Sequence, residues 1–384
     1  MNVAQETIET VDRAEPISIS PLEPEPAKRQ GRTTGSPLRI AQVAGPFEPV
    51  PPRGYGGTER VIDALVRELI DRGHEVTTYA SGDSDVLGRL VATVPEALRP
   101  AGFDEDGSGY LLETAMRVLD DASEFDLIHS HVEWSSLWLS RATTTPTAYT
   151  FHGRLDRPWT SGLLERTHGS LVAISEHQAS THPDVDWAAV VHNGLDLSSL
   201  PWRRESGPDL CFVGRVAPEK GVIDAIQVAA RAGRHLRIAA KVGPLPEEQD
   251  YFENVFKPAL KGNDVEFLGE LSDDDRGKLV SESLASLITG VWPEPFGLVV
   301  IESLAAGTPV LGRRVGALPE IIREGVDGFF GDDPEHLAFF VDRVETLDRK
   351  AIRESVVDRF SAKRMADSYE DVYVRAIERA HATR

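Results

Sequence analysis

The sequence predicts an α/β protein with two doubly wound parallel sheets. Short apolar segments of strand character alternate with helical segments along most of the chain. This alternation favours parallel sheets, because a crossover helix is the usual connection between parallel strands. It occurs in two series that meet near residues 200–207, and 384 residues are enough for two domains. We therefore expect one domain at residues 38–201 and a second at 202–361, followed by a final helix at 362–384.

The first series begins with a buried strand at Leu38–Ala44, followed by a loop rich in proline and glycine. An amphipathic helix at Arg60–Arg72 comes next, with Gly73 as its stop signal, and then a strand at His74–Ala80. The remaining strands of this series are predicted at Asp126–His131, Thr147–His152, Leu171–Ser175 and Ala189–Asn193.

The second series has five predicted strands, at Leu210–Gly214, Leu236–Val242, Val265–Leu268, Ala285–Thr289 and Pro309–Gly312. Three helical segments close the chain, at about Pro334–Leu347, Arg349–Phe360 and Ala362–Ala382. In open parallel sheets, ligands bind outside the carboxyl ends of the strands. Functional residues are therefore expected directly after strands.

The charge and cysteine content exclude several classes of protein. A formal net charge of −21 is unfavourable for binding nucleic acid or anionic lipid, so a phosphate site must be local. The single cysteine, Cys211, rules out an intrachain disulfide. No apolar run is long enough to span a bilayer, and the acidic first residues do not resemble a signal peptide. We expect a cytoplasmic protein, free or at a membrane surface, with residues 1–37 disordered.

The most informative motif is Pro-Glu-Pro-Phe-Gly-Leu at residues 293–298, continued to Glu302. Pro295 favours an extended Glu294, so the helix is expected to start near Gly297 with Glu302 about one turn inside. Backbone amides at the helix start can hold an anion or sugar hydroxyls, and the two carboxylates can accept hydrogen bonds from hydroxyl groups. From local physics alone, an alternative interpretation is equally favoured, in which Glu294 caps the helix and Glu302 is solvated.

A second motif, Gly214–Gly221, follows a strand and precedes a helix predicted at Val222–Ala232. Lys220 lies at the helix start, where the dipole disfavours a cation by about 0.3–1 kcal/mol unless an anion binds there. Arg215 and Lys220 together can neutralise a diphosphate. The alternative is that Arg215 forms a salt bridge within the protein and that Lys220 is solvated.

Glycines also occur between the first strand and the first helix. Gly56 and Gly57 allow the backbone to approach a ligand closely, although a plain flexible turn would have the same composition. The segment contains neither the dinucleotide fingerprint nor the Gly-Lys-Ser/Thr phosphate loop.

Three histidines and an acidic triplet are weaker candidates. His152 ends a predicted strand at the ligand-binding edge, where a structural role is the alternative. His129 and His131 share a strand face, but two ligands do not make a metal site. Asp83 and Asp85 form an Asp-x-Asp pattern that is expected by chance in so acidic a chain. We therefore predict no metal site.

Together these segments resemble the retaining family-4 glycosyltransferases of GT-B fold, from about Leu38 to the C-terminus. The resemblance is carried by Gly56–Gly57, Thr150–Gly153, Asn193–Asp196, Gly214–Arg215, Glu219–Gly221, Glu294–Glu302, Ala305–Val310 and Gly316–Glu320. It implies two Rossmann-like domains with a cleft between them and a last helix that crosses back to the first domain. It also implies a nucleotide-sugar co-substrate, no required cofactor and no essential metal.

The resemblance also implies roles for single residues. Arg215 and Lys220 would hold the donor diphosphate, and Glu302 the nucleotide ribose. Glu294 and the amides of Phe296, Gly297 and Leu298 would hold hydroxyls of the donor sugar. Gly56 and Gly57 would lie beside the phosphates, and His152 beside the donor sugar. We count His152 and Glu294 as the catalytic candidates.

The resemblance leaves donor and acceptor open. The expected reaction is transfer of a hexose, with a UDP-sugar slightly favoured over a GDP- or ADP-sugar, to a glycan, a lipid-linked acceptor or a small molecule. Many family members have a Gly-x-Gly turn where this chain has Lys241–Pro244, so the base is open. Two alternatives are a nucleotide-sugar epimerase of related architecture, which needs no acceptor, and a non-catalytic nucleotide-sugar-binding protein.

Overall fold

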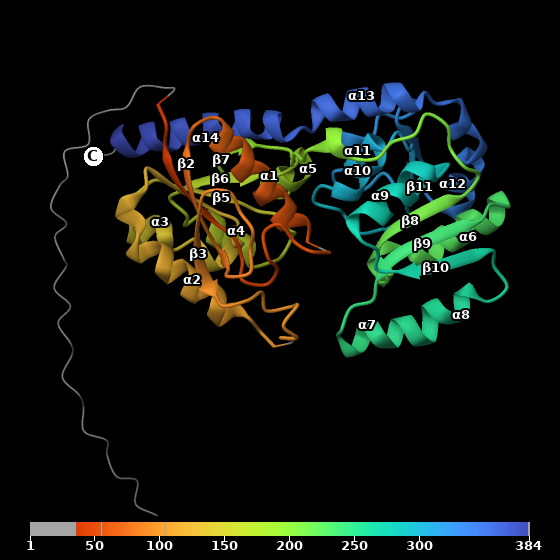
Figure 1. Ribbon diagram of the computed structural model, residues 1–384, viewed down its shortest axis with the longest axis horizontal. Helices are drawn as coiled ribbons and strands as arrows, with labels where there is room; N and C mark the ends of the chain where they lie inside the picture. Colours follow the sequence, from red (N-terminus) through yellow and green to blue (C-terminus); the bar gives the residue numbers. More distant parts are fainter. Residues whose placement is uncertain (1–35, 55, 104, 383–384) are drawn as a thin grey trace, which may run out of the picture. The chain divides into compact units, whose positions relative to one another are not determined.

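The computed structural model describes residues 36–54, 56–103 and 105–382, and it contains two parallel sheets, which confirms the predicted fold class (Figure 1). The first sheet has seven strands in the order β3-β2-β1-β4-β5-β6-β7, and the second has six in the order β10-β9-β8-β11-β12-β13. Every strand pair in both sheets is parallel. In each sheet the first strand in the chain lies near the middle, with later strands added on both sides.

The first domain starts with β1 and the amphipathic helix α1, whose buried side is formed by Val61, Ile62, Leu65, Val66 and Leu69. Its strands are β1 (Arg39–Val43), β2 (Glu75–Ser81), β3 (Arg89–Val94), β4 (Leu127–Ser130), β5 (Thr147–Thr150), β6 (Ser170–Ala173) and β7 (Trp187–Val190). Its helices are α1 (Gly57–Asp71), α2 (Ser108–Asp120), α3 (Leu139–Ala142), α4 (Thr160–Leu164) and α5 (Glu176–Ser180).

The second domain repeats this plan. Its strands are β8 (Leu210–Arg215), β9 (Leu236–Lys241), β10 (Val265–Gly269), β11 (Ala285–Ile288), β12 (Val310–Gly312) and β13 (Gly328–Phe330). Its helices are α6 (Val222–Ala232), α7 (Pro246–Tyr251), α8 (Lys257–Leu260), α9 (Asp273–Glu282), α10 (Leu298–Ala305), α11 (Leu318–Ile321), α12 (Pro334–Phe340) and α13 (Arg349–Arg359). No described helix combines the length and the apolar character that a membrane span requires.

The structure adds two strands that the sequence did not predict, β3 and β13, each at an edge of its sheet. β3 is buried only at its last two residues, Thr93 and Val94, and β13 is only three residues long. Neither segment therefore shows the continuous apolar run by which the inner strands were recognised. The predicted segment Pro334–Leu347 is also divided, because α12 ends at Phe340 and a 3₁₀ turn follows at Asp342–Thr346.

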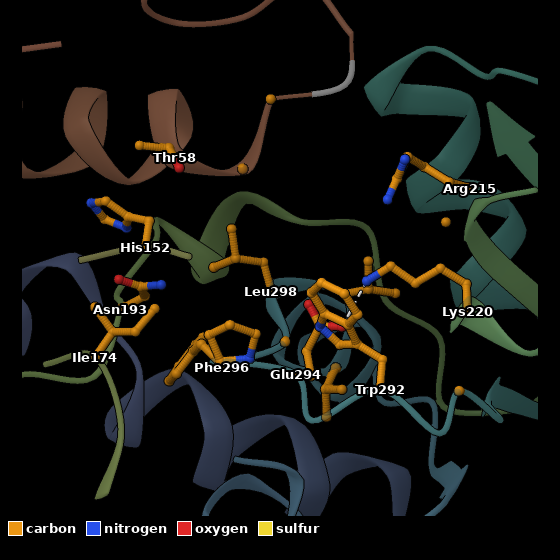
Figure 2. A pocket seen from close by; sticks show the side chains of 18 of the residues that line it. Thr58, His152, Ile174, Asn193, Arg215, Lys220, Trp292, Glu294, Phe296 and Leu298 are labelled. Carbon is orange, nitrogen blue, oxygen red and sulfur yellow. Dashed lines mark hydrogen bonds and ion pairs between the residues drawn. The ribbon is translucent and has the colours of Figure 1, made fainter. Parts of the chain in front are cut away.

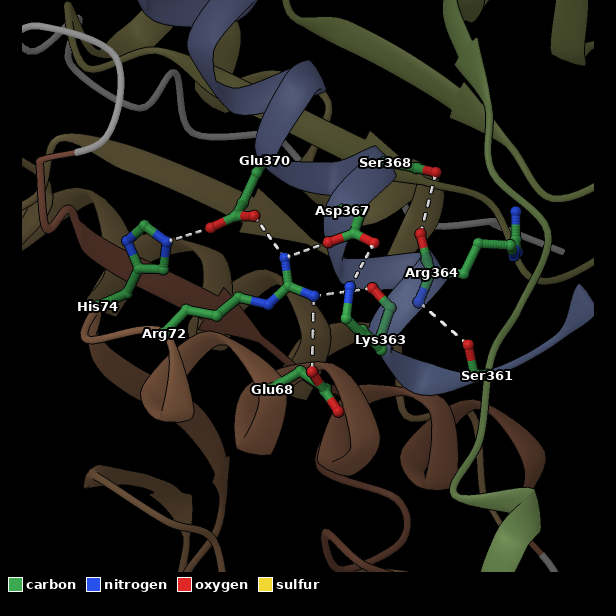
Figure 3. Close-up of polar contacts among 9 residues, drawn as sticks. All are labelled: Glu68, Arg72, His74, Ser361, Lys363, Arg364, Asp367, Ser368 and Glu370. Carbon is green, nitrogen blue, oxygen red and sulfur yellow. Dashed lines mark hydrogen bonds and ion pairs between the residues drawn. The ribbon is translucent and has the colours of Figure 1, made fainter. Parts of the chain in front are cut away.

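The last helix, α14 (Ala362–Ala382), packs against α1 and β5 of the first domain. Its buried side repeats every three to four residues and consists of Ala362, Met365, Ala366, Tyr369, Val372, Tyr373 and Ala376. Polar contacts fix one edge of this helix (Figure 3). Arg72 lies 2.7 Å from Asp367, and His74 lies 2.8 Å from Glu370. The predicted disorder of residues 1–37 concerns residues that, apart from the last two, lie outside the described part of the chain.

Candidate active site

Both sheets contain a topological switch point, where the strand order changes direction. It lies between β1 and β4 in the first sheet and between β8 and β11 in the second. Ligands bind outside the carboxyl ends of strands at such points. Loops that follow these strands line a cavity of about 570 Å³ (Figure 2). Nine of the ten predicted site residues line it: Gly56, Gly57, His152, Arg215, Lys220, Glu294, Phe296, Gly297 and Leu298.

The tenth residue, Glu302, lines a smaller cavity of about 100 Å³. Gly56 and Gly57 line both cavities, so the two are adjacent. Gly57 has little free space around it, because a Cβ there would lie 3.0 Å from Cδ1 of Leu298. The structure thus brings the predicted residues together around two adjoining spaces, with Gly56 and Gly57 between them.

The charges beside β8 are paired with each other. Lys220 Nζ donates to Glu294 Oε2 at 2.6 Å, and the two side chains are partly exposed, at 23% and 30%. Figure 2 shows the two side chains meeting at one end of the cavity, with His152 at the other. Lys220 ends a 3₁₀ turn rather than starting α6, since Gly221 has a φ of 71° and precedes the helix. The alternative of a solvated Lys220 is therefore wrong.

Arg215 forms two salt bridges, as the alternative reading of this motif proposed. Its guanidinium donates to Glu219 and to Glu248, both at 2.9 Å. Glu248 comes from α7, and its carboxylate lies where a Cβ at Gly243 would be. An anionic ligand at Arg215 would therefore compete with two carboxylates.

Glu294 lies in the segment without regular secondary structure before α10, and its backbone carbonyl accepts from Ala317 N at 2.9 Å. The alternative that Glu294 caps the helix is wrong, because Gly297 is the N-cap and no side chain caps this end. α10 starts at Leu298, one residue later than predicted. Within the described chain, no hydrogen bond uses the amides of Phe296, Gly297 or Leu298, which leaves them available to a ligand.

Glu302 lies one turn inside α10 and is not solvated, with a side chain only 14% exposed. Its Oε1 lies 3.5 Å from Arg60 of α1 and 3.3 Å from Arg276 of α9. Asp273 also bonds both arginines, so the four side chains form one charged cluster. A ribose hydroxyl that donates to Glu302 would enter this cluster.

His152 follows β5 and is held from two sides. Glu133 Oε1 accepts from the backbone amides of His152 and Gly153, at 3.1 and 2.6 Å. The ring Nε2 of His152 lies 2.9 Å from Nδ1 of His131. Burial lowers the pKa of His152 to about 4, so the ring is neutral at pH 7.

The weaker metal candidates have other partners. His129 and His131 bond buried side chains of the first domain and α14. Asp83 accepts from the amide of Ala97 at 2.9 Å. Over the described residues, no group of three potential ligands could hold a metal ion. The predicted metal independence is a statement about activity and stays a prediction.

The sequence analysis assigned no role to two cavity residues near His152, although it named Asn193 in one of the segments that carry the resemblance. Glu133 has a φ of 48°, which is rare for a residue other than glycine and stores strain of about 1–3 kcal/mol. Burial raises the pKa of its carboxyl, and two backbone amides lower it. Asn193 also lines the cavity, and its buried Oδ1 has no hydrogen-bond partner among the described residues. The position of Glu133 just after β4, beside the switch point, was the available signal.

Comparison with known sequences identifies both halves of the chain. Residues 55–199 match the family described as Glycosyltransferase Family 4, and residues 202–355 match Glycosyl transferases group 1. An uncharacterized glycosyltransferase of Methanocaldococcus jannaschii is 31% identical over 89% of this chain and 99% of its own. A D-inositol 3-phosphate glycosyltransferase of Mycolicibacterium gilvum is 30% identical over 89% of this chain and 90% of its own.

Solved structures show the same fold. A sucrose-phosphate synthase from Thermosynechococcus elongatus has a TM-score of 0.72 at 19% identity, covering 89% of this chain and 99% of its own. A glycosyltransferase involved in avilamycin A biosynthesis has a TM-score of 0.66 at 24% identity, covering 89% and 98%. The two parallel-sheet domains, the family matches in both halves and the relatives that match over most of the chain all indicate the same family. The chain belongs to the family-4 glycosyltransferases of GT-B fold.

Proposed function

We propose that this glycosyltransferase moves a hexose from a nucleoside-diphosphate sugar to a hydroxyl acceptor, with retention of configuration and without a metal ion. The observation that carries the proposal is the Lys220–Glu294 pair in a cavity that His152 and free helix amides also line. This arrangement combines a cation for a phosphate group with acceptors and donors for sugar hydroxyls.

The charge balance supports a diphosphate as leaving group. Lys220 and Arg215 both line the cavity, and their present partners are carboxylates. A diphosphate that replaces these carboxylates receives charge-assisted hydrogen bonds of about 1.5–3 kcal/mol each. The same cations stabilise the negative charge that develops on the departing phosphate, which is the task of a metal ion in other transferases.

The two glutamates suit two parts of the donor. Glu294 lies beside the amides at the start of α10, where a sugar with several hydroxyls can both donate and accept hydrogen bonds. Glu302 lines the adjoining smaller cavity, one helical turn further along α10. We assign sugar hydroxyls to Glu294 and ribose hydroxyls to Glu302.

The proposed reaction needs no protein nucleophile. The bond between the sugar C1 and the diphosphate oxygen breaks, and the acceptor oxygen forms a bond to C1 on the same face. The acceptor proton passes to the departing phosphate oxygen. Lys220 and Arg215 hold that phosphate, and His152 orients the sugar.

A UDP-sugar is the donor that we favour. One structural neighbour of 18% identity, from Anabaena, was solved in complex with UDP and glucose, with a TM-score of 0.67. A starch synthase of 15% identity was solved with ADP and acarbose, so the fold accepts more than one base. We expect the base preference to depend on residues 241–244, at the end of β9 and in the loop that follows it.

Thermal unfolding with added nucleotides tests this proposal. A ligand that binds only the folded chain stabilises it by about 2.7 kcal/mol at a concentration of 100 Kd. We expect UDP to raise Tm more than ADP or GDP, and UDP-glucose to raise it at least as much as UDP. Absence of stabilisation by every nucleoside diphosphate and nucleotide sugar would contradict the proposal.

A further inference from the structure

A chain of buried polar side chains connects α14 with His152. Gln42 of β1 and His129 of β4 are neighbours in register, so their side chains lie on the same face of the sheet. Tyr373 of α14 covers this face, where all three side chains are fully buried. Its hydroxyl accepts from Gln42 Nε2 at 3.1 Å and lies 2.8 Å from His129 Nδ1.

The contacts continue from Gln42 to the cavity. His131 Nε2 lies 2.9 Å from Gln42 Oε1, and His131 Nδ1 lies 2.9 Å from His152 Nε2. We call Tyr373, Gln42, His131 and His152 the histidine relay. A buried polar chain is tolerated only when its hydrogen bonds are made, and this one reaches the cavity at His152.

The position of each proton follows from the neutral state of the rings. Burial holds the pKa of His131 well below its usual value and that of His152 at about 4, so each ring carries one N–H. The Gln42 carbonyl oxygen can only accept, so His131 Nε2 carries the hydrogen and His131 Nδ1 has the lone pair. His152 Nε2 must then donate to His131, which leaves Nδ1 of His152 as an acceptor.

The orientation of the Gln42 amide decides this outcome. With its NH₂ directed to Tyr373, the carbonyl faces His131. If the amide turned over, its NH₂ would donate to His131 Nε2, and the proton on His152 would move to Nδ1. In the orientation that the structure has, the Tyr373 hydroxyl accepts from the NH₂ at 3.1 Å, and its own hydrogen can be donated to His129 Nδ1, 2.8 Å away.

We propose that Tyr373 is a positioning residue for sugar binding: through Gln42 and His131 it fixes His152 as the Nε2–H tautomer, whose Nδ1 accepts a hydrogen bond from a donor-sugar hydroxyl. That the ligand is a donor sugar rests on the proposed function, whereas the tautomer of His152 does not depend on it. Through this contact α14 takes part in substrate binding as well as in packing.

Nuclear magnetic resonance of the full chain with ¹⁵N-labelled histidine tests the tautomer, because two-bond correlations distinguish protonated from unprotonated ring nitrogens. The chain has 11 histidines, and the His152 signals are identified by their loss in His152→Gln. We expect N–H at Nε2 in the wild type. Tyr373→Phe should move the His152 proton to Nδ1, wholly or in part.

Tyr369→Phe is the matched control. Tyr369 lies one turn away on α14, and its hydroxyl lies 2.8 Å from that of Thr150, which lies 2.8 Å from His129. Tyr369 therefore reaches Gln42 only through His129 and Tyr373, and its removal leaves the bond between Tyr373 and Gln42 in place. This variant should leave the His152 tautomer unchanged. Gln42→Met tests the same link without a change in the helix, since it removes the carbonyl that accepts from His131, and the His152 signals should again change.

Calorimetric titration with UDP and UDP-glucose supplies the second measurement. Tyr373→Phe should reduce the affinity for UDP-glucose relative to UDP by about two- to tenfold, the value of one neutral hydrogen bond, and should leave UDP affinity unchanged. A purely structural effect would weaken both ligands together.

Three results would overturn the inference: a wild-type His152 with its proton on Nδ1, an unchanged tautomer in both Tyr373→Phe and Gln42→Met, or a changed tautomer without loss of the sugar contribution. Failure of every nucleotide sugar to bind would instead contradict the proposed function. The tautomer signals would then still decide whether Tyr373 controls His152.

Discussion

The two sides of the cavity differ in the kind of polar groups that line them and in how these groups are paired. In the second domain the polar groups are charged and form ion pairs: Lys220 is paired with Glu294, and Arg215 with Glu219 and Glu248. In the first domain, His152 belongs to a buried chain of neutral groups whose partners are already fixed. Ion pairs at a partly exposed surface contribute little stability and can be exchanged for a ligand, whereas a buried network resists rearrangement. The difference suggests that charge recognises the diphosphate, and that a preorganised neutral group recognises the sugar.

The largest expected effect is the loss of nucleotide affinity when a cation, Lys220 or Arg215, is removed. Lys220→Met or Arg215→Met should weaken nucleoside-diphosphate binding by about 1.5–3 kcal/mol, that is, roughly 10- to 150-fold. Calorimetric titration with UDP measures this loss. Lys257→Met is a control, because Lys257 of α8 pairs with Glu253, which lies one turn before it, and lines neither cavity. Equal UDP affinity in all three variants and the wild type would remove both cations from the site.

The buried neutral histidines should make the free energy of unfolding of the chain depend on pH. Burial lowers the pKa of His152 to about 4 and that of His129 to about 3, whereas the unfolded chain titrates near 6.5. Between these values the unfolded chain binds more protons, so the free energy of unfolding should decrease as pH falls from 6.5 towards 4. One such histidine contributes up to about 3 kcal/mol over this range.

Chemical denaturation at a series of pH values checks this expectation. His152→Gln should flatten part of the decrease, because glutamine has no proton to bind. A stability that stays constant from pH 6.5 to pH 4 would contradict the neutral, buried state of these rings.

Glu133 supports the neutral side through the backbone. Glu133→Ala should destabilise the chain by about 1–3 kcal/mol, because two buried amides lose their acceptor. Glu133→Gln retains an oxygen for both amides and should cost much less. Thermal unfolding of the two variants gives the comparison, and equal destabilisation would show that the carboxylate has a role beyond holding the amides of His152 and Gly153.

Metal removal should have the smallest effect. If Lys220 and Arg215 supply the positive charge for the leaving group, glycosyl transfer should continue at an unchanged rate in excess EDTA. Transfer measured with and without the chelator checks this. Complete loss of activity that manganese restores would contradict it and would return Asp83 and Asp85 to consideration.

Local sequence determined the parts of the site that were predicted well. Pro295 restricts the backbone of Glu294 directly, so the start of α10 was predicted within one residue. The Gly-Thr-Pro sequence at residues 307–309 indicated where the same helix ends. The inner strands were found because burial on both faces makes them continuous apolar runs.

Long-range partners could not be predicted in this way. Glu248 reaches Arg215 across 33 residues of sequence, and Tyr373 reaches Gln42 across 331. Nothing local distinguishes Glu248 from the other acidic side chains of α7, or Tyr373 from Tyr369 on the same helix face. Only the packing of sheet and helix selects one partner among chemically equivalent candidates.

Glu294 and Glu302 are assigned to different parts of the donor, and calorimetric titration of Glu294→Gln and Glu302→Gln with UDP and UDP-glucose separates the two roles. Glu294→Gln should bind UDP at least as well as the wild type, because Lys220 loses a competing carboxylate, but it should lose about 1.5–3 kcal/mol of the sugar contribution. Glu302→Gln should weaken both ligands equally. If both variants lost affinity for UDP and for UDP-glucose in the same proportion, Glu294 and Glu302 would not hold different parts of the donor.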